Sequence, residues 1–145
     1  MRRASLLAAA CGLFMAMPAR AADSRLLGEW EVEVPGWVMS AKGPTPSLSL
    51  EASAGRVSEM RLSIRPACNS YGGKGRIEGS RIEFDVEAGT LIGCAPELVA
   101  KDRDFVRRLE AVTSFQLSRV PEVPFTRIRL KGRDGTTLMI LRAGR

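Results

Sequence analysis

Cys68 and Cys94 are the side chains whose chemistry the sequence restricts most clearly. A structural zinc site needs four ligands, and two cysteines in a chain without His cannot supply them. A redox pair more often has Cys-x-x-Cys spacing at the start of a helix, and that pattern is absent. In an oxidising compartment the two cysteines would instead form a disulfide, which stabilises a fold by about 3 kcal/mol for a loop of this length.

Other residue combinations that could support catalysis have simpler explanations. Ser70 and Lys74 are four residues apart, but no helix is expected there to hold them as a Ser–Lys dyad. The glycine-rich stretch 72–75 could form a loop that binds an anion, yet it lacks the phosphate-loop pattern, and a tight connection between strands explains it as well. Six carboxylates lie on the polar phase of expected strands: Glu29, Glu31, Glu33, Glu83, Asp85 and Glu87. We therefore expect that the protein is not an enzyme and that it binds no cofactor and no metal ion.

Basic residues alternate along one expected strand near the C-terminus, at Arg127, Arg129 and Lys131. They would form a stripe for phosphate or for an anionic membrane, although one solvated strand face is the more ordinary interpretation. Aromatic residues make up only 6% of the chain, which leaves little surface on which bases could stack. A nucleic-acid partner is therefore not expected.

The first 21 residues have the features of a secretory signal peptide. Arg2 and Arg3 precede an uncharged apolar run, residues 4–17, and the small residues Ala19 and Ala21 predict cleavage before Ala22. Cleavage would lower the formal net charge from +6 to +3, because the segment holds three Arg and no acidic residue. We expect a single mature domain, residues 22–145, in the periplasm or the secreted fraction.

Two alternatives to a cleaved signal peptide are weaker. A helical run of about 14 residues would span only ~21 Å, short of the ~30 Å of a membrane core, so no transmembrane segment is expected in the mature chain. A lipoprotein would be acylated at Cys11, but the preceding residues 8–10 form a degenerate lipobox, and the chain stays apolar after Cys11.

Alternation of apolar and polar residues predicts strands through most of the mature chain. Trp30, Val32 and Val34 share one face of the first strand. The expected strands cover about 26–34, 48–51, 57–65, 76–77, 82–87, 115–117, 125–131 and 136–142. The Asp-Gly step within 132–135 is typical of a hairpin turn.

Residues 96–111 depart from this alternation and predict a helix. Pro96 suits its first turn, and Glu97 suits its positive N-terminal end. Its apolar face comprises Leu98, Phe105, Leu109 and Val112, and its solvent side comprises Lys101, Arg103, Asp104, Arg107 and Arg108. The predicted fold is β-rich (α+β), with about eight antiparallel strands in one sheet curled toward a barrel and the helix packed on it.

Several short motifs carry a resemblance to a known family. They are Leu27-Gly28-x-Trp30, Cys68-Asn69-x-Tyr71-x-Gly73, Thr90-x-x-x-Cys94, the helix with Glu97, Phe105 and Leu109, and the closing strands through Leu138. On these residues the chain, from 26 to 143, resembles the META-domain family, which includes the HslJ-like heat-shock-associated proteins of bacterial envelopes. Ala67 stands where the family usually has Gly, and Ile92-Gly93 stands where it usually has Met before the second Cys.

The resemblance implies a compact envelope domain related to proteins of stress tolerance or antibiotic resistance. It supports the disulfide at both cysteine positions and supplies no catalytic residues. Asn69, Tyr71, Gly73 and Thr90 are its motif residues, and the stretch 68–75 is a candidate contact loop. Asn69 can cap a turn, and Tyr71 offers an aromatic ring with a polar tip. Closing one end of the barrel is the plainer role for the same residues.

Three hypotheses about function follow. The favoured one is a monomeric, non-catalytic envelope domain that supports stress tolerance through contacts with an unknown envelope protein. The alternative is a binder of a small apolar ligand inside the curled sheet, in a cavity lined by Val32, Leu50, Leu62, Phe84 and Ile140. An enzyme is the least favoured class.

Overall fold

The computed structural model describes residues 23–38, 43–119 and 126–143. The predicted signal peptide, its cleavage site and Cys11 lie outside the described residues, so they stay predictions. Among the described residues no helix is long and apolar enough to cross a membrane.

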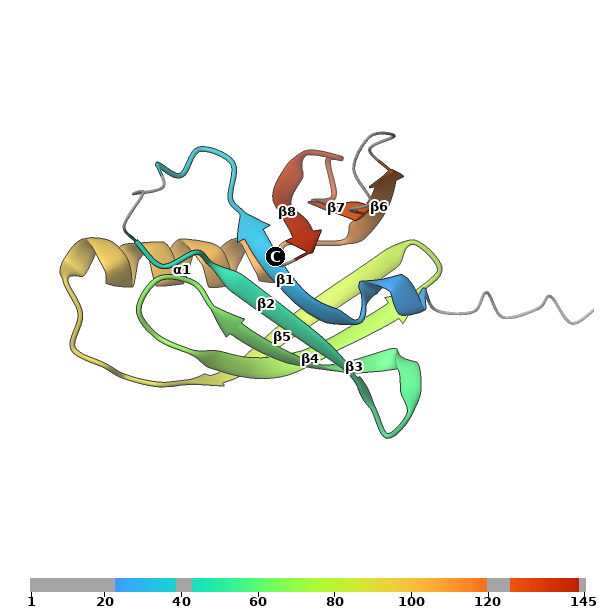
Figure 1. The fold of residues 1–145 in the computed structure, drawn as a ribbon, viewed down its shortest axis with the longest axis horizontal. Coiled ribbons are helices and arrows are strands. Elements are labelled where there is room, and N and C mark those ends of the chain that lie inside the picture. Colours follow the sequence, from blue (N-terminus) through green and yellow to red (C-terminus); the bar gives the residue numbers. More distant parts are fainter. Residues whose placement is uncertain (1–22, 39–42, 120–125, 144–145) are drawn as a thin grey trace, which may run out of the picture.

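Eight antiparallel strands follow one another in chain order around a closed barrel (Figure 1). A 3₁₀ turn, η1 (Ser24–Leu26), precedes the first strand, and one helix, α1 (Pro96–Glu110), stands between the fifth and sixth strands. The strands are β1 (Gly28–Glu33), β2 (Ser47–Ser53), β3 (Arg56–Arg65), β4 (Tyr71–Glu78), β5 (Arg81–Gly89), β6 (Ser114–Arg119), β7 (Thr126–Lys131) and β8 (Thr137–Ala143). The predicted β-rich fold with one helix is therefore confirmed.

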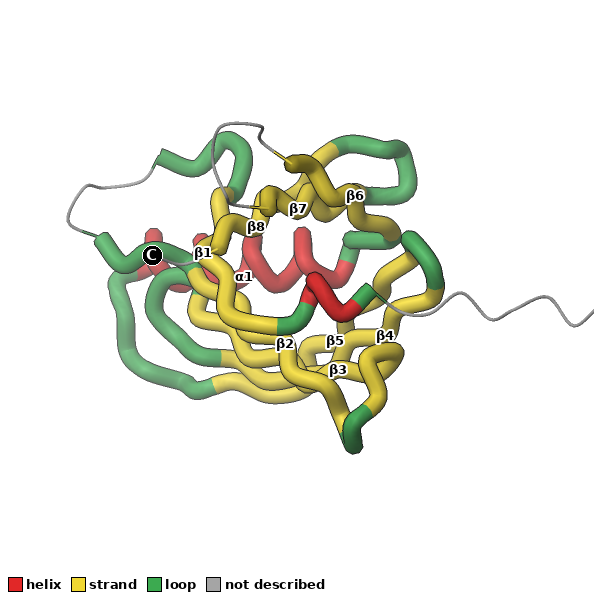
Figure 2. The backbone as a smooth tube through the Cα atoms, turned by 45° about the vertical axis from the view of Figure 1, so that its right-hand side comes forward, coloured by secondary structure: helices red, strands yellow, loops and turns green. Residues whose placement is uncertain are grey.

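The strand pairing is shortest between β5 and β6, and α1 stands between these two strands in the chain. These two strands share a single residue pair, Arg81 with Ser114, whereas β1 and β8 pair over four residues. The helix contacts β5 and β8 and lies across the ring of strands (Figure 2). Its residues Phe105 and Leu109 are fully buried in the common core. The helix thus completes a core that eight strands alone would leave open.

The glycine-rich stretch 72–75 lies within β4, so the predicted loop from 68 to 75 is wrong beyond residue 70. A Cβ atom on Gly73 would overlap the backbone carbonyl of Asp85, and one on Gly75 would lie 2.9 Å from the terminal methyl carbon of Met60. The pairing register shifts between Gly72 and Gly73, which marks a β-bulge. These glycines allow close packing within a strand and do not form a turn.

Ile140 lies on the outer side of β8, so its predicted place in the barrel interior is wrong. It pairs with Glu33 and Arg129 and is only partly buried, whereas Met139 and Leu141 are fully buried. Residues 138–141 are all apolar, so alternation cannot set the phase of this strand. Pairing with the buried residues of β7 sets the phase instead.

Candidate functional site

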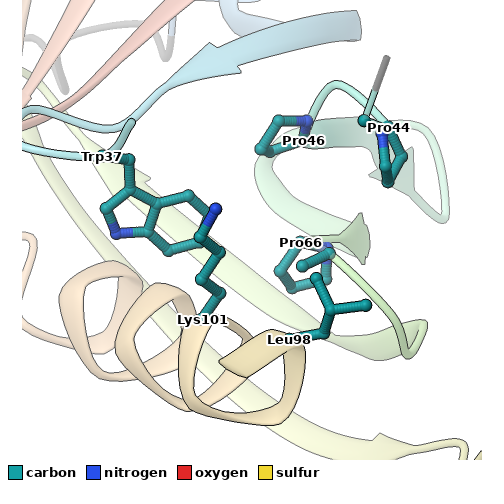
Figure 3. A pocket seen from close by; sticks show the side chains of 8 residues that line it. Trp37, Pro44, Pro46, Pro66, Leu98 and Lys101 are labelled. Atoms are coloured by element: carbon teal, nitrogen blue, oxygen red, sulfur yellow. The ribbon is translucent and has the colours of Figure 1, made fainter. Parts of the chain in front are cut away.

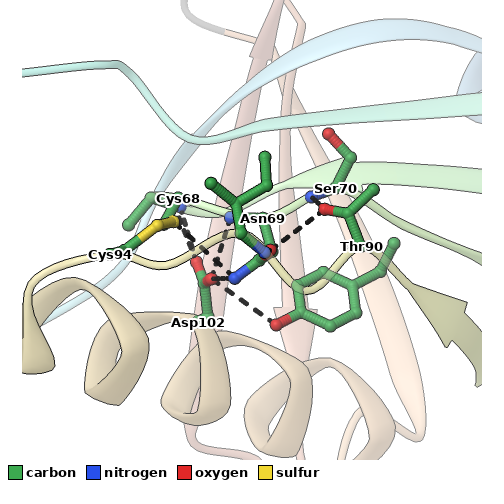
Figure 4. The surroundings of a disulfide bond; sticks show 9 residues. Cys68, Asn69, Ser70, Thr90, Cys94 and Asp102 are labelled. Atoms are coloured by element: carbon green, nitrogen blue, oxygen red, sulfur yellow. Dashed lines mark hydrogen bonds between the residues drawn. A yellow bond between two sulfur atoms is a disulfide. The ribbon is translucent and has the colours of Figure 1, made fainter.

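A buried carboxylate, Asp102, connects the helix to the loop between β3 and β4. Asp102 is fully buried on α1, and its two oxygens face the backbone of residues 67–69 (Figure 4). The backbone N–H groups of Ala67 and Cys68 each donate to Oδ1 at 3.0 Å, and that of Asn69 donates to Oδ2 at 2.9 Å. Hydrogen bonds from three successive N–H groups to this carboxylate fix the loop on the helix.

Asn69 joins this loop to the segment that follows β5. Its side-chain Nδ2 donates to Asp102 Oδ2 at 3.1 Å. Its Oδ1 accepts from Thr90 Oγ1 at 3.0 Å and from the backbone N–H of Ile92 at 2.8 Å. Ser70 N also donates to Thr90 Oγ1 at 3.1 Å. Asn69 was expected to bond nearby backbone, but it bonds backbone 23 residues further along the chain.

Tyr71 points into the same cluster from the start of β4. Its ring lies against Gly89, where any added Cβ would overlap it, and its hydroxyl donates to Asp102 Oδ2 at 3.5 Å. Burial raises the pKa of Tyr71 above its usual value near 10, and the charge of Asp102 and the hydrogen bond to it raise it further, against a smaller opposing effect of Arg103. Tyr71 therefore holds the cluster together rather than standing free for a partner.

Cys68 and Cys94 form the predicted disulfide. Their Cα atoms are 6.4 Å apart, within the usual range of about 4.4–6.8 Å. The bridge links the loop before β4 to the residues just before α1. The same loop is therefore linked covalently to the segment before α1 by the disulfide and to α1 itself by the hydrogen bonds of Asp102.

We refer to Asp102, Asn69, Tyr71, Thr90 and the disulfide as the Asp102 cluster. Every buried side-chain nitrogen and oxygen of the described residues has a hydrogen-bond partner. The described residues also contain no group of three His, Cys, Asp or Glu placed to hold a metal ion. Donors already occupy both oxygens of Asp102. The cluster therefore fixes three chain segments relative to one another: the helix, the loop before β4 and the segment after β5.

Asp102 was not among the residues predicted from the sequence, although a signal for it was present. The apolar helix face comprises Leu98, Phe105, Leu109 and Val112, and position 102 falls in the same series, four residues after Leu98 and three before Phe105. An acidic residue in the buried phase of an amphipathic helix indicates a paired, structural carboxylate.

A second cluster pins the connection between β1 and β2 onto the helix. Trp37 Nε1 donates to Asp104 Oδ2 at 2.8 Å, and Arg108 Nε donates to the same oxygen at 2.8 Å. Lys101 lies 5.5 Å from the centre of the Trp37 ring. Burial acts to raise the pKa of Asp104, but hydrogen bonds from Trp37, Arg107 and Arg108 outweigh it and lower that pKa. The prediction that Lys101, Asp104 and Arg108 face solvent is therefore wrong, since all three are half-buried.

A small cavity next to this cluster does not match the predicted ligand site. It measures about 80 Å³ and lies between the β1–β2 connection and α1, outside the barrel, lined by Trp37, Leu98, Lys101 and three prolines (Figure 3). Sites for small molecules are usually about 300–1,000 Å³. The residues expected to line an interior cavity, Val32, Leu50, Leu62 and Phe84, are instead packed in the core with exposures of 1–6%. The described part of the chain gives the apolar-ligand alternative no support.

A wider surface groove of about 440 Å³ lies over β3–β5. Its carboxylates, Glu59, Glu83 and Asp85, are all exposed, and each pairs across the strands with a cation. Because the three carboxylates have similar surroundings, none of them stands out as a catalytic acid and none as a catalytic base.

The fold and the Asp102 cluster define a small closed barrel whose buried polar residues hold the helix, the loop before β4 and the segment after β5 together. The sequence model of the META domain matches residues 25–145, so the chain belongs to the META-domain family. Searches among curated proteins and among solved structures gave no significant match.

Replacing Asp102 with Asn should destabilise the protein by about 3 kcal/mol or more. An amide offers one acceptor oxygen, so its NH₂ group would face buried N–H donors that now bond a carboxylate. Urea unfolding measures the loss, with the exposed Asp85→Asn as the matched control, expected to cost less than about 0.5 kcal/mol. Equal stability of the two variants would contradict the role assigned to Asp102.

A Cys94→Ala variant should unfold with a free energy lower by about 2–5 kcal/mol, since the bridge restricts the unfolded chain. Its melting temperature should drop by several degrees for each kcal/mol lost. A Cys68→Ala/Cys94→Ala double variant should melt close to the single one. Free alkylation of both cysteines in unfolded, unreduced protein would show that no bridge forms.

The phenol of Tyr71 should titrate above pH 10 in the folded protein and near pH 10 in denaturant. The unfolded chain loses this proton first, so the stability contributed by Tyr71 is full below pH 10 and is lost as pH rises through the raised pKa. Phenolate absorbance measures it directly, because the chain has one Tyr. A folded midpoint at or below the denatured one would refute the placement of Tyr71 against Asp102.

Proposed function

We propose that this META domain is a non-catalytic envelope domain that supports stress tolerance through protein contacts. The observation that carries the proposal is the segment Leu91–Ile92, between β5 and α1. Leu91 is 101% exposed and Ile92 is 59% exposed. Among the described residues, the one other large apolar side chain so exposed is Val38.

The backbone around Leu91 and Ile92 is held on both sides. The preceding Thr90 bonds Asn69, the N–H of Ile92 bonds Asn69, and Cys94 carries the disulfide. A contact segment fixed in advance loses less conformational entropy on binding. Burying a leucine or isoleucine side chain against a partner contributes about 1.5–3 kcal/mol. The contact segment is therefore 91–92. Of the residues first considered for contact, Asn69 bonds this segment directly, and Tyr71 lies against Gly89 just before it.

The proposal includes a periplasmic or secreted location. The predicted signal peptide and a disulfide both suit an oxidising compartment. Family membership also supports an envelope role, because the motifs of this chain resemble those of envelope proteins.

A Leu91→Ser/Ile92→Ser variant should lose capture of its envelope partner by at least about tenfold, since each serine removes apolar contact area. The measurement is photo-crosslinking in whole cells from a probe placed at Gly93, followed by mass spectrometry of the captured protein.

Val38→Ser is the matched control, because it removes an equally exposed apolar side chain from a different loop. It should leave capture unchanged, and only the double variant should impair survival of envelope stress. Equal capture by both variants, or no specific capture by the wild type, would overturn the proposal.

A further inference from the structure

The outer faces of the barrel differ in charge balance. On β2–β5, opposite charges lie next to one another across the strands: Glu51 pairs with Arg61, and Lys74 pairs with Asp85. Arg61 also lies 4.0 Å from Glu51, and Lys74 forms a salt bridge with Glu87. Arg61 and Lys74 also lie opposite each other, but each has a carboxylate on its other side, so the charges of both are compensated.

The face formed by β6, β7 and β8 is not compensated. Arg127, Arg129 and Lys131 alternate along the outer side of β7, over a span of about 13 Å at strand spacing. Their neighbours on β6 are the uncharged Ser118, Gln116 and Ser114. We call these three cations the β7 basic row. None of the three has a carboxylate partner among the described residues.

The strands beside the row add positive charge rather than neutralise it. Arg127 pairs directly with Arg142 on β8, and Arg81 of β5 pairs with Ser114 beside Lys131. Like charges directly opposite each other destabilise a sheet. Arg142 is bridged to Glu33, so the uncompensated charge stays on the β7 row. The barrel's stability does not explain this arrangement.

We propose that the β7 basic row is a binding surface for an anionic membrane, whose headgroup phosphates supply the missing negative charge. Arg127 and Arg129 can each bond a phosphate with two N–H donors, and Lys131 adds a point charge. A row of cations spread over about 13 Å of one strand fits a surface of repeated phosphates rather than one small anion, because the three charges do not converge on one point. The surface is separate from the Leu91–Ile92 segment, so it goes beyond the proposed protein contacts.

The test compares two variants with the same loss of charge. Arg127→Gln/Arg129→Gln/Lys131→Gln removes the β7 basic row, and Arg61→Gln/Lys74→Gln/Arg76→Gln removes three exposed cations from the compensated face. Co-sedimentation is measured with phosphatidylglycerol–phosphatidylcholine vesicles and with phosphatidylcholine alone. All proteins are expressed from the full sequence, so they share the same N-terminal segment.

The wild type should bind the anionic vesicles only, and raising the salt concentration should weaken binding. The β7 variant should bind at least about 20-fold more weakly, because each basic residue near such a surface contributes about fivefold. The control variant should lose less than about threefold. The melting temperature of each variant checks that the fold is retained.

Three results would overturn the proposal. One is an equal loss of binding in both variants, which would indicate net charge alone. Another is full competition by millimolar inorganic phosphate, which would indicate a site for a free anion. The third is equally tight binding to duplex DNA, which would indicate a general affinity for polyanions.

Discussion

The hydrogen bonds between the Asp102 carboxylate and the backbone of residues 67–69 set the geometry on which the other parts depend. A buried carboxylate without donors is costly, so the helix can dock only where the loop supplies its N–H groups. That docking buries Phe105 in the core, with its ring centre 6.2 Å from that of Trp37. The polar cluster therefore determines where the apolar core is completed.

The residues of the family motif are related by this single interaction. Asn69 bonds Asp102 directly and carries its effect to Thr90 and Ile92, while the disulfide closes the same loop. Asn69, Tyr71 and Thr90 thus hold chain segments together through hydrogen bonds, whereas Gly73 allows close packing against Asp85. Among the described residues, Leu91 is the most exposed large apolar side chain, and it lies beside the residues that Asn69 bonds.

Alternation predicted the strands well wherever apolar and polar residues strictly alternate. The helix was predicted from the spacing of its apolar residues. Alternation failed at 72–75 because glycine is common to turns and to closely packed strands, and only the approach of Asp85 distinguishes them. It failed at Ile140 because a run of apolar residues has no phase. The Trp37 contact with Asp104 joins residues 67 positions apart, so local sequence patterns could not reveal it.

The core and the outer face of β7 are separate in this barrel. The Asp102 cluster and the apolar interior satisfy their own hydrogen bonds and contacts, so the outer face of β7 is free of any structural task that the described residues show. Charges on such a face cost little stability, typically within about 0.5 kcal/mol each, even where Arg127 opposes Arg142. A change of charge on the outer face of β7 should therefore leave the Cys68–Asn69 loop and the helix in the same arrangement.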